Sequence, residues 1–403
     1  MLTKITSGKA KGVFVAPPSK SMAHRLLICA GLSEGESKID NVSFSEDIEA
    51  TINCLVSLGV SVKRKDNSLI IKGQKEYRIN NVLKCNESGS TLRFFIPVSL
   101  AVAGGSSFTG TEKLLSRPLD EYKKICCEQG ISFDRKDNEL VVSGQLKAGK
   151  YEISSEVSSQ FASGLLFALP LLKNDSEIVF VGKVNSKSYI DMTISALKQF
   201  GVEANWKSET SIFIRGNQKY VANNCVVEGD YSNAAFFNAL NFLGSDIQIK
   251  GLNENSLQGD KVCQEFFEKM SEGYCELDIS NCPDLAPILM AMGGVLNGVK
   301  LLGTSRLKAK ESDRGEVMKK ELEKFGITCN VFDNEIEVKK SSIHTPSELI
   351  DSHNDHRIAM AAAVLMTKTG GEIINAQAVN KSFPSFFEEL KRLGIGVESF
   401  ETN

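Results

Sequence analysis

The sequence predicts an α/β fold made of six copies of one repeat, in which a buried helix is followed by a strand, a second helix and a β-hairpin. Six helical stretches begin with similar polar turns and continue into small apolar residues. Residues that mark these starts, Ser19, Ser90, Ser159, Ser232, Asp284 and Asp355, lie 71, 69, 73, 52 and 71 positions apart. The hairpins are also similar in sequence. Such a regular period is typical of internal repeats.

The first polar turn covers residues 17–21 and precedes the apolar residues 26–30. Ser19 or Ser21 is a suitable N-cap, so the first unpaired N–H groups and the positive end of the helix dipole face outward there. Ser21 and Arg25 share one helix face, and Lys20 adds a cation. We expect this helix end to bind a small carboxylate or phosphate, although a capped helix with solvated charges gives the same pattern.

The later repeats begin in the same way, at residues 86–93, 158–161, 229–233, 282–285 and 354–357. Each start leads into a small-residue, apolar segment, which predicts a buried helix with a polar first turn. Short strands follow at residues 106–109, 177–180, 246–249 and 372–374. An amphipathic helix that ends at glycine comes next. Several of these second helices also begin with polar residues, at 116–120, 186–191, 310–314 and 380–384.

Hairpins complete the repeats at residues 59–71, 130–142 and 326–338, with Asp66-Asn67, Asp137-Asn138 and Asp333-Asn334 at their turns. Asp and Asn tolerate the backbone angles that tight turns require. The fourth repeat is short, with a reduced hairpin at 273–279, and the sixth stops after residues 394–397. We expect residues 11–15 to supply the strand that the sixth repeat lacks, which would bring both chain ends into one domain.

Two domains of three repeats each are expected for 403 residues. The division that fits the repeats assigns residues 16–224 to one domain, and residues 1–15 with 225–403 to the other. If the helix N-termini of both domains face one cleft, their dipoles and the nearby lysines and arginines make it strongly positive. Such a cleft suits a small ligand with two or three negative charges.

Composition favours a soluble cytoplasmic protein, since 42% of the residues are hydrophobic, 24% are charged and the net charge is −3. This balance gives no support for binding nucleic acid or an anionic membrane. The apolar runs are shorter than the roughly 18 residues that span a bilayer, and residues 1–6 have no signal-peptide character. The ten cysteines form no CxxC pair, which indicates reduced and mostly buried thiols.

Single motifs leave alternatives open. Residues 310–314 are also typical of a solvated helix start, but Lys310 and Arg314 place two cations on one helix face. His353 and His356 have an HxxH spacing that some metal sites use, and a hydrogen-bonded histidine at a helix start explains them as well. We expect no metal ion. Residues 88–91 resemble a phosphate loop only loosely, because GxxxxGK[ST] does not occur.

Eight motifs, in order along essentially the whole chain, resemble those of the 5-enolpyruvylshikimate-3-phosphate synthase family. They are Pro18-Ser19-Lys20-Ser21 with Arg25, Ser88 to Arg93, Ser158-Ser159-Gln160, Ser186 to Asp191, Pro283-Asp284, Lys310 to Arg314, Asn354 to Arg357 and Asn380 to Pro384. The resemblance implies two inside-out α/β barrel domains with the active site in the cleft between them. It also implies transfer of the enolpyruvyl group of phosphoenolpyruvate to the 5-hydroxyl of shikimate 3-phosphate, with release of phosphate, in chorismate and aromatic amino acid biosynthesis.

The resemblance assigns residues to each substrate. Those for shikimate 3-phosphate are Lys20, Ser21, Arg25, Ser158, Ser159, Gln160, Ser186, Asp284 and Lys310. Those for phosphoenolpyruvate are Lys20, Gly89, Lys113, Arg117, Gln160, Arg314, Arg357 and Lys381. Arginine suits these anionic groups because it forms bidentate hydrogen bonds. The resemblance implies no cofactor and no partner besides the two small substrates, and we expect a cytoplasmic monomer that binds neither nucleic acid nor a membrane.

The implied chemistry is addition followed by elimination. Asp284 would take the proton of the attacking hydroxyl, and Lys20 and Glu311 would exchange protons with the methylene carbon. Cations already in place would stabilise the tetrahedral intermediate from which phosphate leaves. The division of the proton transfers among these three catalytic residues stays open.

Three positions depart from the family pattern. Ser90 follows Gly89 where threonine is usual, Arg306 stands where many members have asparagine, and Lys113 replaces an arginine. The last change turns a forked contact into a point charge, unless Arg117 takes its place. We therefore expect phosphoenolpyruvate to bind more weakly than in arginine-bearing relatives, and Lys113→Arg to lower its KM in a steady-state assay. An unchanged or higher KM would count against this prediction.

Two other functions fit part of the pattern. The enolpyruvyl transferase that acts on UDP-N-acetylglucosamine shares the fold, but it carries a reactive cysteine in the loop that corresponds to residues 110–118, where this chain has none. A noncatalytic module that binds phosphorylated metabolites would need the cations alone. Asp284 and Glu311 favour turnover, since two acids among the cations weaken simple anion capture.

Overall fold

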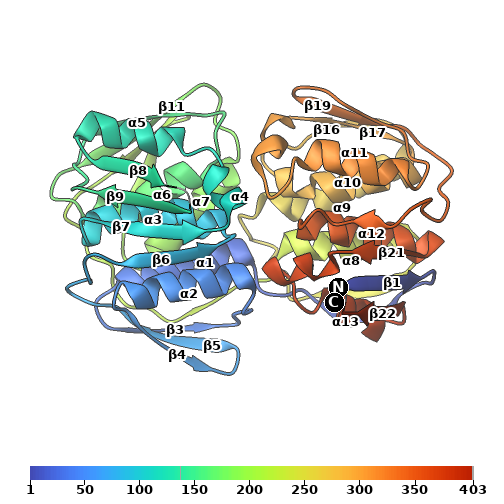
Figure 1. Ribbon diagram of the computed structural model, residues 1–403, viewed down its shortest axis with the longest axis horizontal. Coiled ribbons are helices and arrows are strands. Elements are labelled where there is room, and N and C mark those ends of the chain that lie inside the picture. The colour runs from blue at the N-terminus through green and yellow to red at the C-terminus, as the bar shows by residue number, and fades with distance from the viewer. Residues whose placement is uncertain (137, 402–403) are drawn as a thin grey trace. The chain divides into compact units, whose positions relative to one another are not determined.

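The computed structural model describes residues 1–136 and 138–401, so Asp137 of the second expected hairpin turn lies outside the described residues. The chain forms two compact units (Figure 1). Unit 1 comprises Met1–Pro17 and Gly229–Asn403, and unit 2 comprises Pro18–Glu228. No helix within the described residues combines the length and the apolar character that crossing a membrane requires.

The limits of the units differ from the expected domain limits by two and four residues. Ala16 stays with unit 1 because its N–H donates to the carbonyl of Lys250. Residues 225–228 stay with unit 2, because Cys225–Val226 pairs with residues 39 and 40 and Ser19 N donates to the carbonyl of Glu228. Hydrogen bonds of single residues therefore move the limits, and a repeat period does not show such bonds.

Unit 2 contains three four-stranded sheets. The first sheet pairs, in order, β14 (Cys225–Val226), β3 (Glu36–Asp40), β5 (Ser68–Lys72) and β4 (Ser61–Lys65). The second pairs β6 (Val82–Asn86), β7 (Gly105–Gly110), β9 (Glu139–Ser143) and β8 (Ser132–Lys136). The third pairs β10 (Lys150–Ser154), β11 (Ser176–Val181), β13 (Ser211–Ile214) and β12 (Ala204–Ser208). In each sheet the first pair is parallel and the other pairs are antiparallel. The sequence pattern predicts the strand and hairpin of the repeat but not the additional parallel strand.

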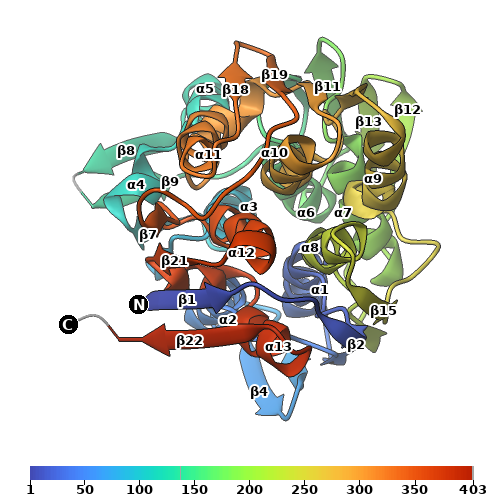
Figure 2. The same ribbon diagram turned by 90° about the vertical axis from the view of Figure 1, so that its right-hand side faces the viewer.

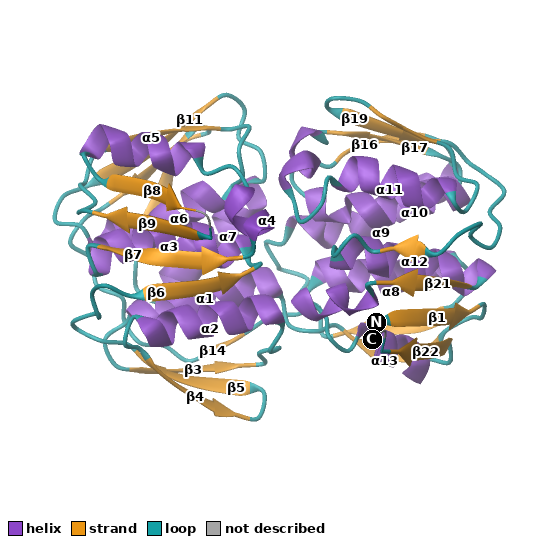
Figure 3. Cartoon of the chain, viewed as in Figure 1, coloured by secondary structure: helices purple, strands orange, loops and turns teal. Residues whose placement is uncertain are grey.

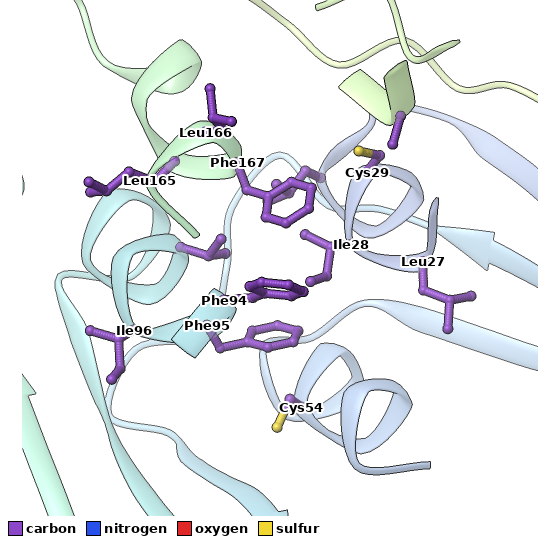
Figure 4. Packing of buried hydrophobic residues seen from close by; sticks show 14 of the residues in the cluster. Leu27, Ile28, Cys29, Cys54, Phe94, Phe95, Ile96, Leu165, Leu166 and Phe167 are labelled. Carbon is purple, nitrogen blue, oxygen red and sulfur yellow. The ribbon is translucent and has the colours of Figure 1, made fainter. Parts of the chain in front are cut away.

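The helices of unit 2 contribute to its core, and some of them are partly exposed. They are α1 (Lys20–Leu32), α2 (Glu46–Ser57), α3 (Gly89–Val102), α4 (Glu112–Ser116), α5 (Asp120–Gln129), α6 (Gln160–Ala168), the 3-10 helix η1 (Leu169–Leu171) and α7 (Lys187–Gln199). Every residue of α1 after Ser21 and of α6 after Gln160 is buried. Figure 4 shows Ile28, Phe94 and Phe167 of α1, α3 and α6 packed against one another in the core. Small and apolar residues on all sides of a helix predict this central position.

Unit 1 repeats the arrangement with two four-stranded sheets and one two-stranded sheet. The sheets consist of β16 (Cys275–Asp278), β17 (Val299–Leu302), β19 (Glu335–Val338) and β18 (Cys329–Val331); of β20 (Ile350–Asp351), β21 (Gly371–Ile374), β1 (Leu2–Thr6) and β22 (Gly396–Phe400); and of β15 (Asp246–Lys250) and β2 (Lys11–Val15). The helices are α8 (Tyr231–Phe242), η2 (Gly259–Val262), α9 (Cys263–Glu272), η3 (Pro283–Leu285), α10 (Ala286–Val295), η4 (Ser305–Ala309), α11 (Arg314–Glu323), α12 (His356–Thr369), η5 (Ala376–Lys381) and α13 (Phe386–Arg392). Figure 3 shows the strands of each unit toward its outside and the helices within, so the expected inside-out α/β architecture is confirmed.

Two strand assignments in unit 1 were wrong. The strand that completes the sixth repeat is β1, which pairs with β21 and β22 (Figure 2), whereas β2 pairs in parallel with β15 of the fourth repeat. The reduced hairpin expected at residues 273–279 is instead β16, the parallel partner of β17. These short segments all have a strand-like pattern, so the sequence does not distinguish between their possible partners. Both chain ends nevertheless lie in unit 1, as expected.

The ten cysteines are free thiols, and eight of them are buried. Burial raises the pKa of the Cys29 and Cys282 thiols well above the ordinary value, which favours their neutral form. This state agrees with the reduced and mostly buried thiols that the sequence predicted.

Candidate functional site

Lys20 begins α1, and the Ser19 side chain caps that helix by accepting a hydrogen bond from Met22 N. The Lys20 ammonium donates to Asp47 Oδ2 over 2.7 Å. Asp47 lies in the first turn of α2, so two helix N-termini meet at this ion pair. Asp47 belongs to none of the motifs that predict the site, although acidic residues in a first helical turn are a recognisable signal.

Arg25 joins α1 to α7. Its guanidinium donates to the carbonyl of Ser21 over 2.5 Å and to Thr193 Oγ1 over 2.9 Å. It also donates to the carbonyl of Tyr189 over 2.9 Å. Burial lowers the pKa of Arg25 to about 10, so the side chain remains a cation at neutral pH. Ser186 lies one turn before Tyr189, directly before the first residue of α7, and it is buried with a φ of 52°. The predicted residues Ser21, Arg25 and Ser186 therefore border the same two helices, α1 and α7.

Gly89 begins α3, which Ser88 caps by accepting from Thr91 N. A Cβ atom at Gly89 would lie 2.7 Å from Arg117 Nη1, so the Arg117 guanidinium lies directly against the backbone at this helix end. Arg117 is buried, whereas Lys113 is exposed on the short helix α4. Arg117 is therefore a buried cation at this helix end, as is Arg93 of α3, whereas Lys113 is not.

Gln160, the first residue of α6, connects this end of α3 to α6. Its Nε2 donates to Ser90 Oγ over 2.8 Å, and its Oε1 accepts from Arg93 Nη1 over 2.8 Å. Ser158 Oγ accepts from Gln160 N, and the partly exposed Ser159 is the N-cap residue of α6. Arg93 is part of the motif at residues 88–93, but the sequence gives it no role. Its contact with Gln160 shows that it helps to hold the side chain of Gln160 in place.

In unit 1, Asp284 of η3 contacts three cations. Its Oδ1 accepts from Lys310 Nζ over 3.1 Å and from Arg314 Nη1 over 2.7 Å. Its Oδ2 accepts from Arg357 Nη2 over 3.3 Å. Burial opposes ionisation, but the positive charges of Arg357, Lys310 and Arg314 hold the pKa of Asp284 well below its usual range. Asp284 is therefore an anion at neutral pH.

Arg314 begins α11 and is fully buried. Besides Asp284, its guanidinium donates to Asp355 Oδ2 over 2.9 Å and to Glu311 Oε2 over 2.6 Å. Burial disfavours the cation, but Asp355, Glu311 and Asp284 together raise the pKa of Arg314 above its usual range. The sequence marks Asp355 only as the start of a helix, and the structure shows that it is also a partner of Arg314.

The linked groups of unit 1 balance in charge. They are the cations Lys310, Arg314 and Arg357 and the anions Asp284, Glu311 and Asp355. The sequence predicted a strongly positive cleft, whereas these six groups by themselves carry no net charge. An incoming anion therefore exchanges with a carboxylate or adds a contact to a neutral cluster.

Two further cations lie in the same unit. Lys381 is buried at the end of η5, and its ammonium donates to the carbonyl of Asn354 over 2.6 Å. Arg306 of η4 donates to the carbonyl of Ser280 over 2.5 Å. The two histidines considered for a metal site differ in their surroundings, because His353 Nε2 lies 2.9 Å from Glu321 Oε1 and His356 is buried in the first turn of α12.

Known proteins resemble this chain over nearly its whole length. A family model described as EPSP synthase (3-phosphoshikimate 1-carboxyvinyltransferase) matches residues 5–390. The 3-phosphoshikimate 1-carboxyvinyltransferase of Clostridium novyi (strain NT) is 40% identical over 422 residues, which cover 97% of each chain. That of Clostridioides difficile (strain 630) is 38% identical over 429 residues and 98% of each chain. The solved structure of EPSP synthase from Acinetobacter baumannii has a TM-score of 0.78, at 23% identity over 99% of this chain and 100% of that chain, and supports the fold.

Proposed function

Because the chain belongs to the EPSP synthase family, we propose that it transfers the enolpyruvyl group of phosphoenolpyruvate to the 5-hydroxyl of shikimate 3-phosphate and releases phosphate. The reaction serves chorismate and aromatic amino acid biosynthesis. The cytoplasmic location and the monomeric state stay predictions from the sequence.

The observation that carries this proposal is the contact of Asp284 with Lys310, Arg314 and Arg357. An ionised carboxylate accepts the proton of an attacking hydroxyl, and general-base catalysis of this kind contributes about 10²–10⁴-fold to a rate. Cations fixed around it stabilise negative charge that develops in the transition state. A module that only captured anions would have no use for the carboxylate.

The two steps need a balanced exchange of protons. In the addition, the 5-oxygen of shikimate 3-phosphate bonds to C2 of phosphoenolpyruvate, its proton passes to Asp284, and C3 gains a proton. In the elimination, C3 loses a proton, the C2–O bond to phosphate breaks, and the proton that Asp284 took from the hydroxyl passes to the departing phosphate. Lys20 and Glu311 are the groups that we propose for the proton transfers at C3.

The proposed binding residues come from both units. Lys20, Ser21, Arg25, Ser158, Ser159, Gln160, Ser186, Asp284 and Lys310 would bind shikimate 3-phosphate. Lys20, Gly89, Lys113, Arg117, Gln160, Arg314, Arg357 and Lys381 would bind phosphoenolpyruvate. The fixed orientation of the Arg25 guanidinium and the position of Arg117 against Gly89 support these roles, because a preordered cation loses less entropy on binding an anion.

Arg314 adds a condition to this scheme. Its guanidinium already contacts Glu311, Asp284 and Asp355, so a substrate carboxylate would have to replace one of them. Asp355 is fully buried, and Asp284, which is 16% exposed, also pairs with Lys310 and Arg357, so we propose that Glu311, which is 20% exposed, is the carboxylate that exchanges. We propose that this exchange releases Glu311 for proton transfer at C3.

Phosphate release tests the proposal directly. The protein is mixed with shikimate 3-phosphate and phosphoenolpyruvate together, and with each substrate alone, and free phosphate is measured over time. We expect phosphate only from the complete mixture. Binding without release would identify the noncatalytic module, and release with UDP-N-acetylglucosamine as acceptor would identify the related transferase.

Gly89→Ala is expected to raise the KM for phosphoenolpyruvate about tenfold and to leave folding intact. The new Cβ would meet Arg117 Nη1 at 2.7 Å and move this flexible guanidinium, while alanine suits a helix better than glycine. Steady-state kinetics and thermal unfolding provide the two measurements. Gly273→Ala is the matched control, since no described atom lies within 4 Å of its Cβ position. A KM equal to that of the control would show that Arg117 does not act there.

A further inference from the structure

A buried chain of hydrogen bonds lies beneath the N-termini of α1, α2 and α3 in unit 2. His24 Nδ1 lies 2.8 Å from Thr51 Oγ1, and Thr51 Oγ1 lies 2.8 Å from Thr91 Oγ1. Thr91 Oγ1 in turn donates to Ser88 Oγ over 2.7 Å. All four residues are fully buried. The chain therefore runs from α1 through α2 to the residue that caps α3.

This chain lies one helical turn below the Lys20–Asp47 ion pair. His24 follows Lys20 by four residues on α1, and Thr51 follows Asp47 by four residues on α2. Residues four apart lie on the same helix face. The two helices are thus joined twice, by the Lys20–Asp47 ion pair and one turn deeper by the contact of His24 with Thr51.

The hydrogen bonds all point in one direction. The single proton of the Thr91 hydroxyl points to Ser88 Oγ at 2.7 Å or to the Asp47 carbonyl at 3.5 Å. In either case Thr91 Oγ1 accepts from Thr51, and Thr51 then accepts from an N–H at His24 Nδ1. Nε2 of His24 is buried without a hydrogen-bond partner among the described residues, which suits a ring nitrogen without a proton. Burial, together with the charges of Lys20 and Arg25, lowers the pKa of His24 well below its usual value. His24 is therefore a neutral donor.

We propose that His24 is a positioning residue, which acts through Thr51 and Thr91 to set the cap of α3, and with it Gly89, against Lys20 for phosphoenolpyruvate. The inference rests on the proposed function, because that function gives Gly89 and Lys20 their roles. Ser88 receives hydrogen bonds from both Thr91 N and Thr91 Oγ1. Without Thr51 the Thr91 hydroxyl can turn toward the Asp47 carbonyl, which leaves the cap with the Thr91 N bond alone. The neighbouring Arg25 bonds to α7 instead, and its contacts do not depend on the chain.

Thr51→Val tests the inference, because valine has the shape of threonine and lacks its hydroxyl. We expect the KM for phosphoenolpyruvate to rise about threefold to tenfold, as the loss of one hydrogen bond does, and the KM for shikimate 3-phosphate to stay within about twofold. Thr51→Ser, which keeps a hydroxyl, should restore most of the loss. Thr367→Val is the matched control, since Thr367 Oγ1 is buried on α12 and bonds only to the local carbonyl of Val364. An equal change in both KM values, or none beyond the control, would overturn the inference.

A second measurement needs no variant and no activity. Nitrogen-15 spectra of the imidazole rings distinguish the two tautomers, and the chain has four histidines to assign. We expect His24 to carry its proton on Nδ1 and to remain neutral from about pH 7 down through the ordinary histidine pKa of about 6.5, because burial lowers its own pKa well below that value. A proton on Nε2, or a cationic ring in this range, would overturn the inference. If the wild-type protein releases no phosphate, the proposed function fails, and these spectra still decide the hydrogen-bond chain.

Discussion

Asp284→Asn should lower kcat for phosphate release by about 10²–10⁴-fold, the contribution of one general base. Asparagine keeps the shape of the side chain and loses its proton affinity. The KM values should change less than kcat, because Lys310, Arg314 and Arg357 remain in place to bind anions. Asp333→Asn is the matched control, since Asp333 is exposed and pairs with Lys308 at the surface. A kcat within tenfold of the control would remove Asp284 from the mechanism.

The same variant should unfold more easily. Removing one partner of a fully buried ion pair costs about 3–5 kcal/mol, and the 16% exposure of Asp284 reduces this to about 2 kcal/mol. The folded-state pKa of Asp284 is depressed, so its stabilising effect is complete above the unfolded-state pKa of about 3.9 and is lost as the pH falls through the folded-state value. Urea unfolding at neutral and acidic pH measures this. A difference between wild type and variant that grew in acid would contradict the assignment.

Lys20→Met should also reduce kcat by about 10²–10⁴-fold, because it removes a proton donor and a cation at one position. The variant leaves Asp47 without the ammonium that now lies 2.7 Å from its carboxylate. Part of any loss could therefore come from instability. Lys38→Met is the matched control, since Lys38 forms a similar pair with Asp40 over 2.8 Å in the same unit and is more exposed.

A double variant separates the two effects. Lys20→Met with Asp47→Leu removes both charges, so no unpaired carboxylate remains to destabilise unit 2. We expect the double variant to regain stability in thermal unfolding and to stay as inactive as Lys20→Met. Recovery of turnover along with stability would mean that Lys20 has a structural role only.

Local signals explain what could be predicted of the fold. Helix caps, apolar periodicity and turn residues act within a few positions of the chain, and together they predicted the six repeats and the central helices. The parallel strands were missed because each is separated from its partner strand by a helix or by a longer stretch of chain, so no hairpin turn marks the pairing, and β14 and β20 have only two residues each. The partner of β2 was assigned wrongly because strand pairing depends on contacts between distant segments.

The residues of the candidate site also fall into two groups, those that motifs indicate and those that only the fold brings together. Lys20, Asp284 and Arg314 were recognisable from motifs, because each stands at a helix start within a polar turn. Their partners Asp47 and Asp355 were not, since the chain separates Lys20 from Asp47 by 27 residues and Arg314 from Asp355 by 41. A sequence shows which charges are present, and only the fold shows which of them neutralise one another.

The sequence by itself determined the repeat, the α/β class and the set of cations and acids, because caps, periodicity and residue type are properties of short segments. Only the tertiary structure decided that Arg314 is already bound by three carboxylates, that Arg117 lies against Gly89, and that His24 reaches the cap of α3 through two threonines. These features depend on distances of about 3 Å between residues that are far apart in the chain. Such distances arise only when the helices pack, since burial and hydrogen bonding then fix each side chain in one position.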